Sequence, residues 1–221
     1  MTGVQTCAFR STSVFSRNAT PSLSGAGFDT EGRSLPAEMI GDTVAGGGVT
    51  FNIGPRDNGR ANAVACRGQN IKLPQGDWNR IYLLAASADG DTEGVFKIGE
   101  QPVALRIQNW GGFIGQWDNR VFEGNTAVSL KAGFIKRDPL AWFCSHRHLK
   151  DGKDDPYAYS YLFAYAIDIP VGAATLTLPE NEKIKIVAAT VSCNGPDVVV
   201  PAHPLYDDFT GRQAMELKPE Q

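Results

Sequence analysis

The chain has 221 residues, a net charge of -3 and a pI of about 5.6. This balance argues against nucleic-acid binding, which needs a basic patch or stripe, and no stretch approaches the roughly 18 apolar residues of a membrane span. A hydrophobic content of 42% supports a globular core, and 24 glycines and 13 prolines favour an all-β fold with many turns. We therefore expect neither nucleic acid nor a membrane as a partner.

The N-terminal segment differs in character from the rest. Residues 1–11, MTGVQTCAFRS, match the translation of a common short-read sequencing adapter. We therefore expect the natural protein to continue upstream, so the lack of a signal peptide here carries no information. Residues 12–27 are rich in Ser, Thr, Gly and Ala, which is typical of a linker. We assign residues 1–27 to an adapter-derived and linker-like lead-in.

Short β-like runs separated by turn signals fill residues 28–195, which we assign to one β-sandwich domain. The almost continuously apolar run at 79–88 predicts a central strand, and the next runs predict a hairpin around Gly99-Glu100. In 155–170 large side chains alternate with small ones, and this period of two predicts a long strand. Shorter strands are predicted at 48–53, 62–66, 69–74, 174–179 and 182–192. We expect the Pro-rich tail, 196–221, to pack on or trail the sandwich.

Six long runs, in order, resemble the C-terminal β-sandwich region of bacterial α-mannosidases of glycoside hydrolase family 38, over about residues 28–212. They are FDTEGRSLPAEMI, QNIKLPQGDWNRIYLLAASADGD, RIQNWGGFIGQWDNR, GFIKRDPLAWFCSHRH, YLFAYAIDIPVGAATLTLPENEKIKIVAATVS and HPLYDDFTGR. The resemblance implies a galactose-binding-like jelly-roll domain that is not catalytic alone. In that family the zinc-binding catalytic barrel lies upstream, and the parent enzyme would be periplasmic or secreted.

The segment NWGGFIGQWDNR supplies two kinds of side chain that suit a sugar. Aromatic rings stack on the C–H faces of sugars, and planar polar groups pair with their hydroxyls. The alternative is that the tryptophans pack in the core and that Asp118 pairs with Arg120 or Arg137. The candidate carbohydrate-binding residues are Trp110, Trp117, Asp118, Asn119, Arg120, Arg137, His146 and His148.

The stretch WFCSHRHLKDG places Cys144, His146 and His148 at alternate positions, which share one face of a strand. Alternate histidines on a strand can hold copper, iron or zinc when further ligands come from elsewhere. The alternative is that a carboxylate nearby in the sequence, such as Asp151, Asp154 or Asp155, hydrogen-bonds the imidazoles. The resembling family has a small residue in place of Cys144, so we expect this thiol to be buried and not to be a ligand.

The turn ADGDTEG offers Asp89 and Asp91 as possible ligands of a structural calcium ion, with an ordinary solvated turn as the alternative. No other cofactor is assigned. Cys66, Cys144 and Cys193 lack the spacing of a disulfide framework or a structural zinc site, so we expect free thiols.

Together these observations predict a non-catalytic accessory domain of an α-mannosidase-like glycosidase. It would bind a mannose- or galactose-containing glycan weakly, or brace the upstream catalytic domain. The alternative is a free-standing metal-dependent or carbohydrate-active enzyme that uses His146 and His148.

Overall fold

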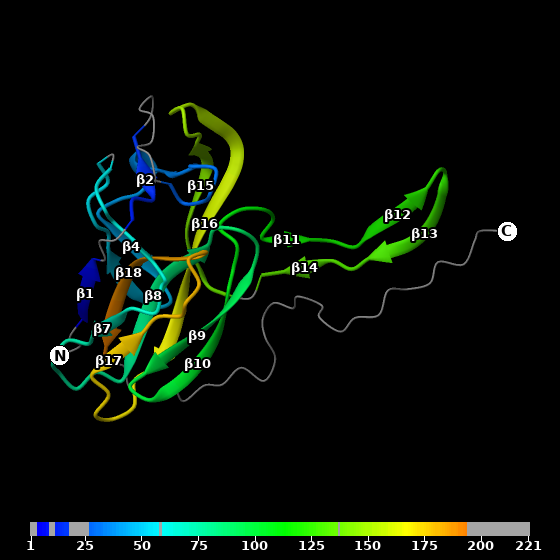
Figure 1. The fold of residues 1–221 in the computed structure, drawn as a ribbon. Coiled ribbons are helices and arrows are strands. Elements are labelled where there is room, and N and C mark those ends of the chain that lie inside the picture. The colour runs from blue at the N-terminus through cyan, green and yellow to red at the C-terminus, as the bar shows by residue number, and fades with distance from the viewer. Residues whose placement is uncertain (1–3, 9–11, 18–26, 58, 137, 194–221) are drawn as a thin grey trace. The chain divides into compact units, whose positions relative to one another are not determined.

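The computed structural model describes residues 4–8, 12–17, 27–57, 59–136 and 138–193, and almost all of its regular structure is β-strand (Figure 1). The chain divides into two compact units. The first unit comprises Met1–Gly112 with Asp138–Pro196, and the second comprises Phe113–Arg137 with Asp197–Gln221. The predicted all-β fold is confirmed, and the first unit contains the sandwich.

A six-stranded antiparallel sheet forms one layer of the first unit. Its centre is β8 (Arg80–Ser87), the strand predicted from the apolar run at 79–88. One edge is β15 (Leu140–His148), which carries the two candidate histidines. The order of the main path is β1 (Val4–Ala8), β18 (Ile184–Ser192), β8, β16 (Asp154–Asp168) and β15, and β6 (Val64–Ala65) also pairs with β18.

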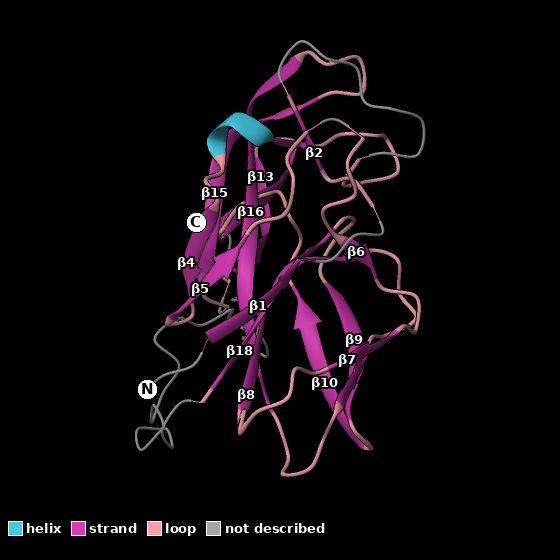
Figure 2. Cartoon of the chain, turned by 90° about the vertical axis from the view of Figure 1, so that its left-hand side faces the viewer, coloured by secondary structure: helices cyan, strands magenta, loops and turns pink. Residues whose placement is uncertain are grey.

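A four-stranded antiparallel sheet forms the second layer, which Figure 2 shows beside the first. On its strand β9, Phe96 and Ile98 are buried and alternate with exposed residues, so one face is turned to the core. Gly99 has a φ of 56° and makes the predicted hairpin turn between β9 and β10. The strand order is β10 (Gln101–Ile107), β9 (Thr92–Ile98), β17 (Thr175–Thr177) and β7 (Asn70–Lys72).

A hairpin of β4 (Thr43–Gly46) and β5 (Val49–Asn52) lies against the six-stranded sheet. The Thr190 hydroxyl of β18 donates to the backbone oxygen of Thr50 at 3.0 Å. At the hairpin turn, a Cβ on Gly47 would meet Ala164 at 3.1 Å, so this backbone approaches the sheet closely. The central strands are therefore covered on both faces, which explains why β8 and β18 are apolar almost throughout.

Residues 12–17 belong to the fold and are not the linker that their composition suggests. Val14 and Phe15 are 0% and 2% exposed, and β2 (Phe15–Ser16) pairs in parallel with β3 (Leu35–Pro36). A short apolar pair in a Ser-rich stretch gives no periodic signal, yet it fills the core once β3 lies beside it. Of the predicted tail, residues 196–221 lie outside the described residues.

The strand β16 spans most of the predicted 155–170 segment, but its two faces do not divide as the alternation suggests. All residues from Ser160 to Tyr165 are buried, because the strand lies inside the two-layer core there. Towards its start, Tyr157 is 83% exposed and has a φ of 61°, which is unusual for a residue with a side chain.

The second unit contains an antiparallel ribbon that the sequence did not predict. It is formed by β11 (Gly115–Gln116) with β14 (Phe134–Ile135), and by β12 (Asn119–Glu123) with β13 (Thr126–Lys131). The short strands and scattered glycines of this segment give no sustained alternation. Among the described residues, no helix combines the length and the apolar character that a membrane crossing needs.

Replacing Leu83 with Ala should destabilise the domain, because Leu83 is fully buried in the central strand and its loss leaves a cavity. The expected decrease in the free energy of unfolding is about 3 kcal/mol, measured by urea denaturation. The matched control is Val95→Ala on β9, where the side chain is 53% exposed and the expected change is within about 0.5 kcal/mol. Equal effects of the two substitutions would contradict this placement of the core.

Candidate functional site

His146 and His148 extend from the edge strand β15 beside an irregular stretch of its partner, β16. Between Cys144 and His146 the chain advances two residues, whereas the paired position on β16 moves four, from Ser160 to Pro156. The extra residues form a bulge, a feature that bends a strand and redirects its side chains. The positive φ of Tyr157 falls within this bulge.

A second segment, Ser34–Ile40, is attached to the end of β15. The backbones of Ser34 and His148 exchange two hydrogen bonds, each of 3.0 Å, and the Trp142 indole donates to the backbone oxygen of Met39 at 3.2 Å. Around the 3₁₀ turn η1 (Ala37–Met39), Ala37 is buried and Glu38 is exposed. This attachment brings the Glu38 carboxylate to the two histidines.

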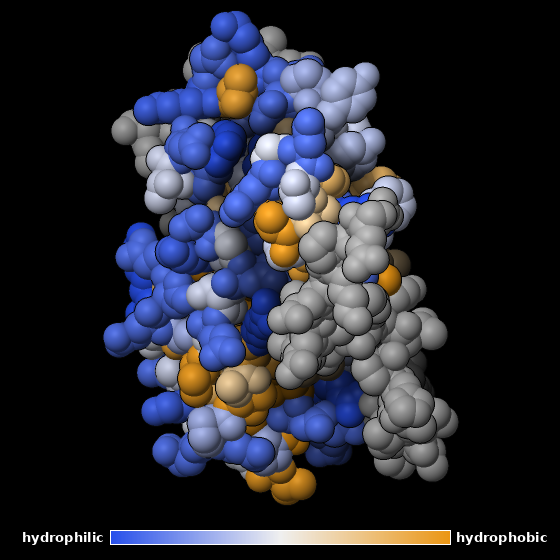
Figure 3. Space-filling model, turned by 90° about the vertical axis from the view of Figure 1, so that its right-hand side faces the viewer, coloured by the Kyte–Doolittle hydropathy of each residue, from blue (hydrophilic) through white to orange (hydrophobic). Residues whose placement is uncertain are grey.

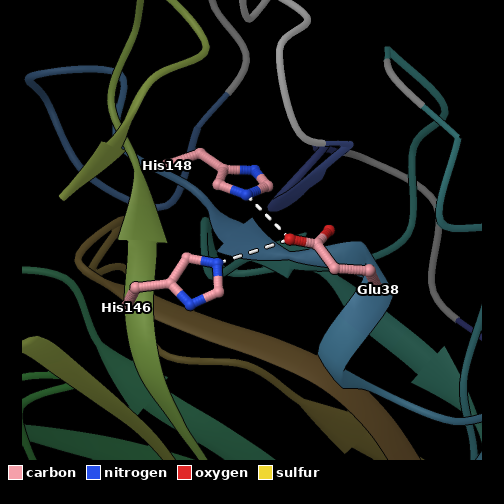
Figure 4. Close-up of side chains that lie close together, drawn as sticks. All are labelled: Glu38, His146 and His148. Atoms are coloured by element: carbon pink, nitrogen blue, oxygen red, sulfur yellow. Dashed lines mark hydrogen bonds and ion pairs between the residues drawn. The ribbon is translucent and has the colours of Figure 1, made fainter. Parts of the chain in front are cut away.

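The three side chains converge on a small volume (Figure 4). Glu38 Oε1 lies 2.9 Å from His148 Nε2 and 3.4 Å from His146 Nε2. Among the described residues, these three form the one group of His, Cys, Asp and Glu side chains whose ligand atoms all lie within 4.8 Å of one another. Glu38 was missed in the sequence because no spacing relates it to histidines more than 100 positions away.

His148 is held from its other side as well. Its Nδ1 lies 2.9 Å from Ser16 Oγ, which in turn lies 2.5 Å from Ser34 Oγ. The exposed side-chain fraction rises from 0% in His148 to 20% in His146 and 41% in Glu38. The cluster is therefore anchored at His148 and open to solvent at Glu38.

Three acidic residues close to the histidines in the sequence were alternatives for binding them. Asp154 Oδ1 lies 3.5 Å from His148 Nε2, within ion-pair distance but farther than the 2.9 Å of Glu38 Oε1. Asp151 instead pairs with Lys153 at 2.8 Å, and Asp155 lies 3.6 Å from Arg147. The nearest carboxylate to the imidazoles thus comes from Glu38, far away in the chain.

Cys144 is buried, as expected, and it is not part of the cluster. Its thiol donates to the backbone oxygen of His146 at 3.0 Å. Burial raises the pKa of Cys144 to about 11, which disfavours the thiolate that a metal would need.

Trp110 lies in the core rather than on a surface. It is 2% exposed, its ring stacks on Phe28 with centroids 4.5 Å apart, and the Arg147 guanidinium lies 4.8 Å from its centroid. This cation–π stack corrects the expectation of a sugar-binding Trp110, because its ring is not accessible to a ligand. The alternative of a structural role holds for this tryptophan.

Trp117 is 85% exposed and belongs to the second unit. The neighbouring Asp118 accepts a hydrogen bond of 2.6 Å from the backbone nitrogen of Gly133. A Cβ on Gly133 would lie 2.4 Å from the backbone oxygen of Gln116, so this close approach requires glycine. Asn119 and Arg120 begin β12, and Arg137 lies outside the described residues.

The two calcium candidates each have other partners. Asp89 pairs with Lys183 at 2.9 Å, and this hydrogen bond lowers the pKa of Asp89. Asp91 accepts a hydrogen bond of 2.8 Å from the backbone nitrogen of Asn109 and lies 3.3 Å from Arg106. Within the described part of the chain, neither carboxylate joins a cluster of three possible ligands.

Comparison with known families gives one result. Residues 11–195 match the family described as the AziU2-like beta-sandwich domain. The chain belongs to this family. A search of curated proteins found no match. The family description names a fold, and that fold agrees with the sandwich of the first unit. It therefore supports the expected β-sandwich. The expected relation to α-mannosidases is left to be tested.

The buried cysteines of this AziU2-like domain should resist alkylation. Burial raises the pKa of Cys66 to about 12 and that of Cys144 to about 11, so both remain thiols at pH 8, and the thiolate is the reactive form. Treatment with iodoacetamide followed by peptide mass spectrometry should modify the exposed Cys193 in the folded protein, and Cys66 and Cys144 only in urea. Modification of Cys144 as fast as Cys193 in the folded protein would contradict its placement.

Proposed function

We propose that this β-sandwich is a non-catalytic accessory domain of a larger, periplasmic or secreted α-mannosidase-like glycosidase, and that it binds carbohydrate weakly through Trp117. The proposal has two supports. The first is the resemblance of the six sequence runs, and the second is the exposure of Trp117 beside polar residues.

The exposure of Trp117 is the observation that carries the proposal. The indole is 85% exposed, so burying its apolar surface against a ligand or partner would be favourable. The hydrogen bond between Asp118 and Gly133 holds the backbone next to this side chain, which lowers the cost of ordering that backbone on binding. A sugar ring could stack on the indole while Asn119 and Arg120 pair with its hydroxyls.

The second unit carries further exposed apolar side chains, which favours bracing of the upstream catalytic domain as the second role. Phe113 and Phe122 are 68% and 56% exposed. Figure 3 shows apolar side chains interrupting a mostly hydrophilic surface on one side of the molecule. Exposed apolar groups of this kind mark either ligand-binding or protein-docking surfaces.

Replacing Trp117 with Ala tests the carbohydrate role. The full chain is titrated with mannose- and galactose-containing oligosaccharides at millimolar concentration by calorimetry. We expect weak binding of at least one glycan by the unaltered chain, and a loss of up to about tenfold in affinity in Trp117→Ala, since an aromatic contact contributes up to about 1.5 kcal/mol.

The matched control is Phe122→Ala, which removes another exposed aromatic side chain of the same ribbon. It should leave glycan affinity within about twofold, because Phe122 lies on β12 beyond the polar residues that follow Trp117. No binding by the unaltered chain at millimolar glycan would rule out the carbohydrate role and favour bracing. Equal affinity in Trp117→Ala would rule out binding through Trp117.

A further inference from the structure

We propose that Glu38, His146 and His148 form a binding site for one divalent transition-metal ion, with Zn²⁺ as the natural probe. This inference is independent of carbohydrate binding, because Trp117 belongs to the other unit of the chain. It also differs from the strand-only hypothesis drawn from the sequence. There the ligands beyond His146 and His148 were left unassigned, whereas the structure supplies Glu38.

The spacing of the three ligand atoms suits such an ion. In a tetrahedral zinc site with bonds of 2.0–2.1 Å, neighbouring ligand atoms lie roughly 3.3 Å apart. Glu38 Oε1 lies 2.9 Å from one imidazole nitrogen and 3.4 Å from the other. Small rotations of these side chains would therefore be enough to seat the ion.

The direction of the imidazoles supports the same conclusion. Both histidines present Nε2 to the same carboxylate oxygen, and Figure 4 shows the two rings turned towards Glu38. A single carboxylate–imidazole hydrogen bond would account for His148 at 2.9 Å, but His146 at 3.4 Å makes a poor hydrogen bond. A shared ion would give both nitrogens and the oxygen a partner at once.

The surroundings of His148 resemble those of a metal ligand. Ligating histidines usually use their second ring nitrogen in a hydrogen bond that fixes the ring and its tautomer. Ser16 Oγ lies 2.9 Å from His148 Nδ1, and both groups are buried. The two backbone hydrogen bonds with Ser34 fix the strand at the same position.

The donor set indicates which ions fit. Two imidazole nitrogens and one carboxylate suit zinc or ferrous iron, whereas calcium and magnesium prefer sets made of oxygen alone. Because Glu38 is 41% exposed, a fourth position could be taken by water or by an anionic ligand. Three protein ligands with one open position are typical of catalytic rather than structural zinc sites.

The experiment is a calorimetric titration of the full chain with Zn²⁺ after removal of metals with a chelator. We expect about one ion per chain, and an affinity at least about 100-fold lower in Glu38→Gln and in His146→Ala, since even outer-shell substitutions cost 10–100-fold. Both sites of substitution are partly exposed, and circular dichroism verifies that each variant is folded. Glu180→Gln, an exposed residue with the same change of charge, is the control and should bind as the unaltered chain does.

A second readout separates this site from adventitious binding. Co²⁺ bound by three protein ligands should show visible absorption bands that Glu38→Gln and His146→Ala lack and Glu180→Gln retains. Trp117→Ala should leave Zn²⁺ affinity unchanged, so a failure of the carbohydrate proposal and a failure of this one are distinguishable. Absence of stoichiometric binding, or equal Zn²⁺ affinity in folded Glu38→Gln and His146→Ala, would overturn the proposal.

Discussion

The two backbone hydrogen bonds between Ser34 and His148 join an N-terminal segment to the last residue of an edge strand, and the candidate site depends on this join. An edge strand presents unpaired backbone groups, and here a passing segment covers its end. The same segment buries Leu35, Ala37 and Ile40, so its position is fixed by the core as well as by hydrogen bonds. Glu38 stays on the outside of this segment, and its carboxylate lies beside the two histidines.

The distribution of burial across the six-stranded sheet explains where chemistry is possible. Its central strands are covered on both faces, and they contain few polar groups. At β15 the covering is incomplete, and the exposed side-chain fraction rises from 0% in His148 to 20% in His146. A bulge in β16 with a positive φ at Tyr157 lies beside them. Polar side chains that are both anchored and accessible therefore gather at this edge, where a ligand could reach them.

The sequence predicted what depends on local pattern. The long alternation predicted β16, and Gly99-Glu100 predicted the hairpin of β9 and β10. The His-x-His spacing predicted two imidazoles on one strand. It could not predict Glu38, which is 110 positions from His148 and meets it only through tertiary packing. The sugar-binding role predicted for Trp110 was wrong for a related reason. Phe28 and Arg147, which enclose its ring, are far from it in the sequence, so the local pattern could not show its burial.

The central claim is that the fold brings Glu38, His146 and His148 together as ligands of one ion. Anomalous diffraction at the zinc edge, from crystals of the full chain soaked in Zn²⁺, tests it most directly. The account predicts a peak about 2.0–2.2 Å from Nε2 of both histidines and from a Glu38 carboxylate oxygen. A map with no peak there, in which Glu38 hydrogen-bonds His148 directly while zinc is bound elsewhere or not at all, would contradict it.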